Sequence, residues 1–239
     1  MDQTVIIDCF PESIRHYKEG YAIVGVDVIR ATTTAVTSVT LGRRCFPVPS
    51  IEVALPLAAK LNNPLLVGEL GGLMPYGFDM NNSPVELMHR SDAFRPMILL
   101  SSSGTKLMYD AGSCDAAYVA CFRNAQAIVN HILGRHRRVA VIGAGTRGEF
   151  REEDQMCCAW IADGLLREGY KPEDAETVEI VKRWRGQPLK ASANGKSAEY
   201  LCKNGQMKDL DFILSHNNDL DAVCMVKHDE VVLIPISEW

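Results

Sequence analysis

The stretch that decides the fold spans residues 22–34 and reads AIVGVDVIRATTT. Its first five residues are apolar or glycine, and the next eight contain an acid, an arginine and three threonines. The apolar run predicts a buried strand over residues 22–29, ending where a helix could begin. The threonines leave two alternatives open: residues 32–34 cap a helix, or residues 32–39 form a strand, because β-branched side chains favour strands.

The same alternation of short apolar runs and helix-like stretches continues along the chain. Further strands are predicted at residues 5–8, 45–48, 65–67, 97–100, 117–120 and 138–142, and helices at residues 51–61, 106–111, 124–133 and 152–168. This order is typical of a sheet whose connections are helices. Several predicted strands are continuously apolar, which indicates that both faces of the sheet are covered. We therefore predict an α/β fold with a mixed, largely parallel sheet.

The residue composition of the sequence changes at about residue 172. Charged helical segments follow, with turns at residues 194–195 and 204–205 and late apolar runs at 222–226 and 231–234. No linker, repeat or low-complexity tract separates this part from the rest. We expect one domain over residues 1–239, with a C-terminal elaboration on the same sheet.

Composition excludes several classes of protein. A formal charge of -5 argues against a general binder of nucleic acid or of anionic membranes. The N-terminus has no basic stretch leading into an apolar one, and no apolar run approaches the roughly 20 residues that span a bilayer, so we expect a cytoplasmic protein. The eight cysteines are scattered without CxxC spacing and are predicted to be reduced core residues.

The sequence also lacks the motifs of several classes of hydrolase. The six histidines form no HxH or HExxH cluster and accompany no G-x-S-x-G elbow, which disfavours a zinc hydrolase or a serine esterase. No GxxxxGK[ST] phosphate loop occurs, which disfavours hydrolysis of nucleoside triphosphates.

In open α/β sheets, ligands bind beyond the carboxyl ends of the strands. The loop after residue 26 offers Asp27 for a hard cation and Arg30 as a bidentate fork for phosphate oxygens. Backbone N–H groups at a helix start would favour the same anion. The alternative is that the threonines only cap a helix and that Arg30 pairs with a surface acid.

Two other strand ends carry candidate residues. Gly104 permits a tight turn that aims N–H groups at an oxyanion within residues 101–105, although an ordinary helix cap would have the same sequence. Glu69 follows residues 65–67 and could complete a magnesium site. Asn82 and Ser83 could meet the substrate, but for Ser83 we predict a helix cap.

The fourth strand end contains Gly143-x-Gly145-x-x-Gly148, which resembles a dinucleotide-binding turn. Acids in the following turn would repel a pyrophosphate at this helix start; they are Glu149, Glu152, Glu153 and Asp154. At helical spacing, Asp154 heads an apolar stripe that continues through Cys158, Ile161 and Leu165. An inward acid there suits a metal, whereas Glu152 favours the helix dipole.

Taken in order, these segments resemble the 2-phosphosulfolactate phosphatase family. The matching motifs are Asp27-Val-Ile-Arg30-Ala-Thr-Thr-Thr34, Gly68-Glu69-x-Gly-Gly, Gly77-Phe78-Asp79-x-x-Asn82-Ser83-Pro84, Ser103-Gly104-Thr105, Asn124, and Ala144-Gly145 followed by Glu153-Asp154. The resemblance implies a three-layer α/β/α fold, a homo-oligomer, and Mg2+-dependent hydrolysis of (2R)-2-phospho-3-sulfolactate to 3-sulfolactate and phosphate, a step toward coenzyme M. The family commonly has arginine where Leu70 stands and asparagine where Ser103 stands.

The resulting hypothesis assigns a role to each candidate. Magnesium would be held by Asp27, Glu69 and Asp154, and a small phosphorylated organic acid by Arg30, Thr32, Thr33, Asn82, Ser103, Gly104 and Thr105. The sequence lacks a paired Asp-x-Asp, which favours attack by a metal-activated water over a phosphorylated Asp27. Two rival classes stay open: a noncatalytic phospho-ligand-binding protein and an NAD-dependent oxidoreductase.

Overall fold

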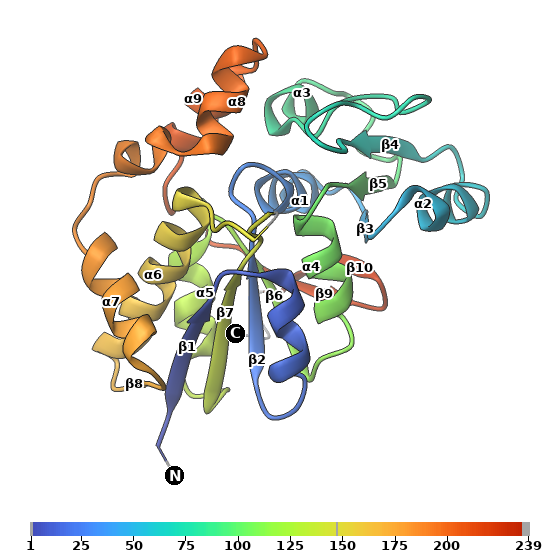
Figure 1. Cartoon of the computed structure of the whole chain (residues 1–239). Coiled ribbons are helices and arrows are strands. Elements are labelled where there is room, and N and C mark those ends of the chain that lie inside the picture. The colour runs from blue at the N-terminus through green and yellow to red at the C-terminus, as the bar shows by residue number, and fades with distance from the viewer. Residues whose placement is uncertain (1, 147, 236–239) are drawn as a thin grey trace.

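The computed structural model describes residues 2–146 and 148–235, and its centre is one mixed sheet of ten strands (Figure 1). The strands lie in the order β4-β5-β3-β10-β9-β6-β2-β7-β1-β8. Their bounds are β1 Thr4–Asp8, β2 Ala22–Val26, β3 Cys45–Val48, β4 Leu65–Gly68, β5 Met97–Leu100, β6 Ala116–Ala120, β7 Arg138–Gly143, β8 Lys171–Pro172, β9 Val223–Lys227 and β10 Glu230–Ile234.

The helices connect these strands and cover them. Their bounds are η1 Pro11–His16, α1 Ala31–Thr40, α2 Ile51–Ala58, α3 Pro84–Met88, α4 Gly104–Ala111, α5 Ala125–Ile132, α6 Glu152–Arg167, α7 Ala175–Trp184, η2 Leu189–Asn194, α8 Lys196–Lys203 and α9 Met207–Ser215. All the strands and helices predicted before residue 170 are confirmed, with ends shifted by at most three residues.

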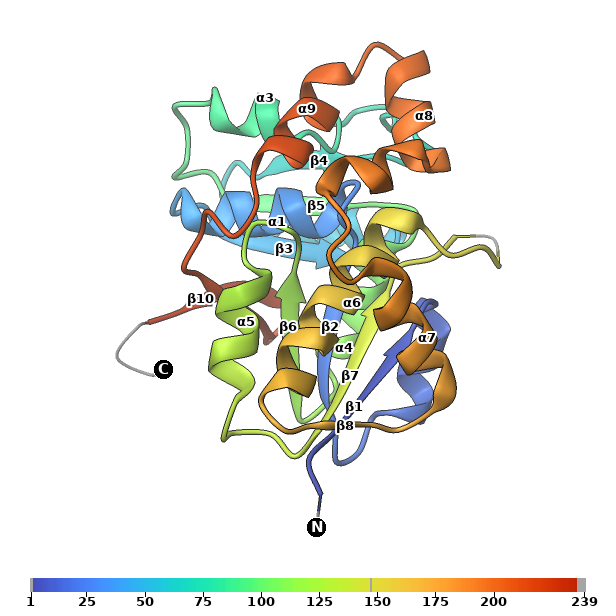
Figure 2. The same ribbon diagram turned by 90° about the vertical axis from the view of Figure 1, so that its left-hand side faces the viewer.

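The sheet consists of two parallel sets joined by a hairpin. Strands β6, β2, β7, β1 and β8 run parallel to one another, as do β4, β5 and β3. The β9–β10 hairpin lies between the two sets and pairs antiparallel with β6 on one side and β3 on the other. In Figure 2 the β3–β5 set runs across the direction of β6, β7 and β1. The predicted mixed, largely parallel sheet is therefore confirmed.

The threonine-rich segment forms helix α1, so the strand alternative for residues 32–39 is wrong. The predicted strand over 22–29 also ends earlier, at Val26, because Asp27 turns its backbone toward the new helix. The N–H of Asp27 donates to the Thr32 hydroxyl at 2.9 Å, and the Thr32 N–H donates to the Asp27 carbonyl at 2.9 Å. These bonds replace the strand ladder, and burial of α1 on the sheet outweighs the strand preference of its β-branched residues.

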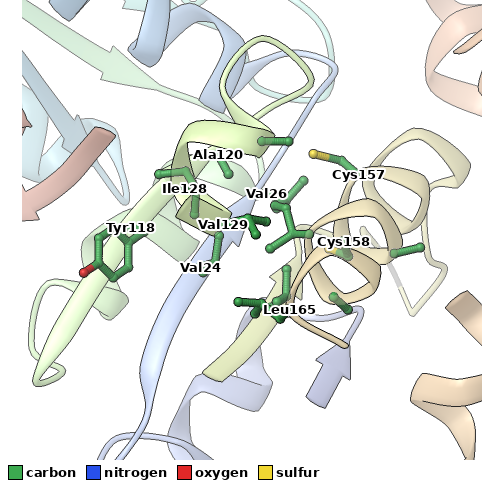
Figure 3. Close-up of a cluster of buried hydrophobic side chains, with 14 of the residues drawn as sticks. Val24, Val26, Tyr118, Ala120, Ile128, Val129, Cys157, Cys158 and Leu165 are labelled. Carbon is green, nitrogen blue, oxygen red and sulfur yellow. The ribbon is translucent and has the colours of Figure 1, made fainter. Parts of the chain in front are cut away.

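Two layers of helices enclose the sheet, which confirms the three-layer α/β/α fold. Helices α5, α6 and α7 cover one face of β1, β2, β6 and β7, and η1, α1 and α4 cover the other. Figure 3 shows the first of these cores, where Val24 and Val26 of β2 meet Val129 of α5 and Leu165 of α6. Continuous burial on both faces explains why these strands are apolar throughout.

The segment after residue 172 contributes to the sheet and to one end of the molecule. The β9–β10 hairpin completes the sheet, whereas α8 and α9 lie at the same end as β4 and α3 (Figure 1 and Figure 2). In the part of the chain that the structure covers, no helix combines the length and the apolar composition needed to cross a bilayer. All eight cysteines are free; five are buried as predicted, but Cys202 on α8 is exposed.

Asn124 fastens the hairpin to the parallel set. Its side chain is fully buried; the amide oxygen accepts from the Cys121 N–H at 2.9 Å. The amide nitrogen donates to the carbonyls of Val119 and Ala222, each at 3.1 Å. One side chain thus joins the end of β6 to the residue before β9.

Asn124→Ala should lower the free energy of unfolding by at least about 2 kcal/mol, because it removes the partners of three buried backbone groups. Urea denaturation provides the measurement. Gln126→Ala on the same helix is the control, since its side chain is exposed and donates one hydrogen bond to Asn130, and the change should be within about 0.5 kcal/mol. Equal stability of the two variants would show that Asn124 does not hold the hairpin.

Candidate functional site

A cavity of about 250 Å³ lies where the loops after β2, β4, β5 and β7 meet, with α8 forming part of its wall. This is the position that the carboxyl-end rule predicts. Six of the candidate residues line it: Asp27, Arg30, Glu69, Asn82, Ser103 and Asp154. The other four, Thr32, Thr33, Gly104 and Thr105, do not.

The loops after β2 and β5 approach each other at Gly104, the first residue of α4. A Cβ atom at this position would lie 2.0 Å from Oδ2 of Asp27, so no larger residue fits. The start of α4 is therefore packed directly against the Asp27 carboxylate, and α1 begins four residues after Asp27. Two helix N-termini, each carrying partial positive charge, meet beside the cavity.

Asp27 and Asp154 are buried acids at this point. Oδ1 of Asp27 accepts from the Ala31 N–H at 3.2 Å, and Oδ1 of Asp154 accepts from the Val28 N–H at 2.7 Å. Asp154 lies on α6 above the buried stripe that the sequence predicted. Each carboxylate uses one of about four acceptor positions on these bonds. The remaining positions are open to a ligand.

The surroundings of these acids disfavour their negative charge. The pKa of Asp27 is raised to about 7, chiefly by burial; the nearby Glu69 and Glu153 contribute to this shift, whereas the Ala31 N–H and Arg30 oppose it. Burial also raises the pKa of Asp154 well above its usual value, and the charge of Asp27 adds to this effect. A cation bound among these carboxyl groups would favour their charged form and so lower their pKa values again.

Glu153 is a third buried acid, which has no predicted role and does not itself line the cavity. Neither of its carboxylate oxygens has a hydrogen-bond partner among the described residues. Burial raises its pKa to about 7; Ser197 opposes the shift, although no hydrogen bond of normal geometry joins them. The backbone comes close at Gly195, where a Cβ atom would lie 3.1 Å from Oε2 of Glu153. The pairing Glu153-Asp154 was the available sequence signal.

Glu69 organises two loops at the rim of the cavity. Its Oε1 accepts from the Ser102 N–H at 2.8 Å, and its Oε2 accepts from the Gly72 N–H at 2.6 Å and the Ser102 hydroxyl at 3.0 Å. Three of its acceptor positions are thus occupied, more than for Asp27 or Asp154.

Arg30 forms a buried ion pair with Asp209 of α9, at 2.6 Å from Nη1 to Oδ2. Its Nη2 also donates to the side-chain oxygen of Asn81 at 3.3 Å. The sequence left open a pairing of Arg30 with a surface acid, but this acid is 5 % exposed. The partner lies 179 residues along the chain, so no local pattern could reveal it.

Asp209 joins α9 to α3 as well. Its Oδ1 accepts from the Ser83 hydroxyl at 2.6 Å and from the Val85 N–H at 3.3 Å. Ser83 also accepts from the Glu86 N–H, which confirms its predicted role as a helix cap.

The threonine hydroxyls shape the loops and do not face the cavity. The Thr33 hydroxyl donates to the Val28 carbonyl at 2.7 Å, and Thr32 bonds the backbone of Asp27. The Thr105 hydroxyl accepts from the Ser101 N–H at 2.8 Å. These hydroxyls therefore bond the backbone just before the starts of α1 and α4.

Ser103 and Asn82 do line the cavity. The Ser103 hydroxyl lies 2.9 Å from that of Thr146, which follows β7. Asn82 is 1 % exposed, and its side-chain oxygen has no hydrogen-bond partner in the described part of the chain. This buried oxygen could accept a hydrogen bond from a group bound in the cavity.

The glycine motif after β7 has a packing role. A Cβ atom at Gly145 would lie 2.3 Å from the Cys9 carbonyl, which explains the small residue without a dinucleotide. The following helix buries Glu153 and Asp154 in its first turn, as expected for a site that repels pyrophosphate. Arg147 lies outside the described residues.

Over residues 2–146 and 148–235, no three His, Cys, Asp or Glu side chains converge closely enough to hold a metal ion unaided.

Comparison with known proteins identifies the family. The family model described as 2-phosphosulpholactate phosphatase matches residues 9–229. A protein of Deinococcus radiodurans is 31% identical over 230 residues, covering 94% of each chain. One from Pseudothermotoga lettingae is 33% identical over 80% of this chain and 84% of its own, and one from Thermus thermophilus 33% identical over 86% and 87%. Each of the three is named a probable 2-phosphosulfolactate phosphatase. With the cavity in the position that the motifs predicted, the chain belongs to the 2-phosphosulfolactate phosphatase family.

Proposed function

We propose that this protein is a phosphatase that hydrolyses (2R)-2-phospho-3-sulfolactate to 3-sulfolactate and inorganic phosphate. The observation that carries the proposal is the meeting of two buried acids, Asp27 and Asp154, with the N-cap residues of α1 and α4 in one cavity. Helix N-termini favour a phosphoryl group, and uncompensated carboxylates favour a cation that would accompany it. Family membership supplies the substrate class.

Arg30 and the helix starts would hold the phosphoryl group. Since Nη1 of Arg30 is fixed by Asp209, the guanidinium is held at the cavity wall with little rotational freedom. Ser103, the N-cap of α4, lines the cavity and is followed by Gly104, and Asn82 adds an amide from the loop before α3. This arrangement orients the phosphate before reaction, which is the main contribution that a protein makes to phosphoryl transfer.

The donor set fits a hard divalent cation, which we propose to be Mg2+. All the donors are oxygens, burial disfavours the negative charge of Asp27, Glu153 and Asp154, and the oxygens of Glu153 have no hydrogen-bond partner among the described residues. Asp27 and Asp154 have the most open acceptor positions and are the favoured ligands, with Glu69 a third candidate. When bound, the cation would neutralise charge on the phosphoryl group and lower the pKa of a nearby water.

The chain's own residues would then exclude solvent and hold the substrate. The ring of Tyr200 packs on Gly72, where a Cβ atom would lie 2.3 Å from its Cζ, and closes one side of the cavity. Ser103 and Thr146 hold their two loops together at 2.9 Å. The family resemblance further supports cytoplasmic location and a homo-oligomer as parts of the proposal.

Removal of divalent cations should abolish phosphate release from 2-phospho-3-sulfolactate, and Mg2+ should restore it. The cation should also raise the melting temperature of the wild-type protein, because it offsets the mutual repulsion of the buried acids. Phosphate release and thermal unfolding, with and without chelator, are the measurements. Full turnover in chelator-treated enzyme would contradict the metal requirement.

Asp27→Asn should reduce turnover at least about a hundredfold, the scale for loss of one principal electrostatic group. The fold should survive, because asparagine still offers an oxygen to the Ala31 N–H and removes a buried charge. The melting temperature should therefore be kept or raised, while its increase on adding Mg2+ should shrink. The exposed Asp211→Asn serves as the control. A lowered melting temperature with normal turnover would make Asp27 a structural partner of Arg30 instead.

A further inference from the structure

Three basic side chains line the cavity, and they differ in how fully their charge is compensated. Arg30 is paired with Asp209 at 2.6 Å. Nζ of Lys196 lies 2.7 and 2.6 Å from the two carboxylate oxygens of Glu149. Arg151 reaches the same Glu149 only at 3.5 Å, and its other acceptor, the Phe150 carbonyl, lies at 3.4 Å.

Arg151 is thus the cation with the most spare hydrogen-bonding capacity at the cavity wall. A guanidinium has five N–H donors, and within residues 2–146 and 148–235 the two long contacts of Arg151 leave most of them unused. Only 16% of the side chain is exposed, and its charge also interacts with the buried carboxyl groups of Glu153 and Asp154, although neither accepts a hydrogen bond from it among the described residues. A planar fork in such surroundings is suited to an oxyanion.

The loop after β4 lines the cavity with Glu69, Gly71 and Gly72 and supplies no cation to it. Leu70 is 40% exposed, its backbone forms a turn with Leu73, and its side chain is absent from the cavity lining. Arg151 instead enters from the loop after β7, directly before the helix that carries Asp154. It belongs to a different loop from Arg30 and from the α4 start, to which the phosphoryl group is assigned.

We propose that Arg151 binds the oxyanion of the substrate that is not the phosphate, a sulfonate or carboxylate, and thereby selects phosphorylated acids over simple phosphomonoesters. This inference rests on the proposed function. The Arg151 side chain is available for binding because it does not cap α6. At this helix start the Gln155 N–H donates to the backbone carbonyl of Arg151, at 2.9 Å.

The test compares wild type and Arg151→Gln on four phosphoesters. These are 2-phospho-3-sulfolactate, 2-phospholactate without the sulfonate, 2-phosphooxypropane-1-sulfonate without the carboxylate, and isopropyl phosphate without either. kcat/KM should fall about 10- to 100-fold for substrates that carry the bound oxyanion, mainly through KM, and by less than about threefold for isopropyl phosphate. A loss confined to the two substrates with a sulfonate identifies the bound group as sulfonate. A loss confined to the two substrates with a carboxylate identifies it as carboxylate.

Two further variants make the result interpretable. Arg151→Lys should recover part of the lost kcat/KM, because it keeps the charge but not the fork. Arg167→Gln at the other end of α6 removes an exposed arginine that pairs with Asp163 and should leave all four substrates unchanged. An equal loss for all four substrates in Arg151→Gln, or no loss for any, would overturn the proposal.

Binding of 3-sulfolactate, followed by calorimetry, separates this proposal from the proposed function. Weaker binding to Arg151→Gln, together with no phosphate release by wild type from any ester, would refute the phosphatase and retain the oxyanion site. If wild type releases phosphate but wild type and Arg151→Gln bind 3-sulfolactate with equal affinity, the phosphatase is supported and the oxyanion site is refuted. If wild type neither turns over an ester nor binds 3-sulfolactate, both proposals fail.

Discussion

The cavity depends on one electrostatic constraint: the carboxylates of Asp27 and Asp154 are both buried, and the charge of Asp27 adds to the cost of ionising Asp154. Such groups are tolerated only where dipoles or cations lie nearby. The fold supplies dipoles by starting α1 and α4 at the same point, which the missing side chain of Gly104 permits. The hydrogen bonds from Ala31 and Val28 then fix both carboxylates toward the cavity.

The C-terminal segment completes the site that the parallel strands begin. Asp209 on α9 holds Arg30 and Ser83 together, so the loop after β2 and the start of α3 are fixed by one carboxylate. Around α8, Gly195 lies against Glu153, and Tyr200 packs on Gly72. A buried ion pair adds little net stability compared with apolar packing, but it restricts geometry, which is the property a binding site needs.

The mixed sheet explains how distant loops meet. The β9–β10 hairpin, formed by the last described part of the chain, separates two parallel sets and reverses the strand direction between them. Because the sets also run across one another (Figure 2), the loops after β4 and β5 reach the loop after β2. Asn124 secures the hairpin by pairing with backbone on both sides of it.

The sequence by itself determined the elements and the ends of the strands. Local apolar runs and glycines are sufficient to locate the strands and their ends, since a buried strand requires apolar side chains at consecutive positions. It therefore located Asp27, Glu69, Asn82, Ser103 and Asp154 at loops that do line one cavity. The motif order also indicated the family, because each motif is short and contiguous.

Only the tertiary structure decided which polar groups serve the cavity and which serve the backbone. The hydroxyls of Thr32, Thr33 and Thr105 satisfy loop atoms within five residues, although their motifs suggested phosphate ligands. Asp209 became visible only once the chain was folded, because its partner Arg30 lies 179 residues away, and Arg151 because the cavity that it lines is built from loops distant in sequence. Periodicity reports which face of an element is buried, whereas charge pairing depends on distances between elements, and only folding sets these.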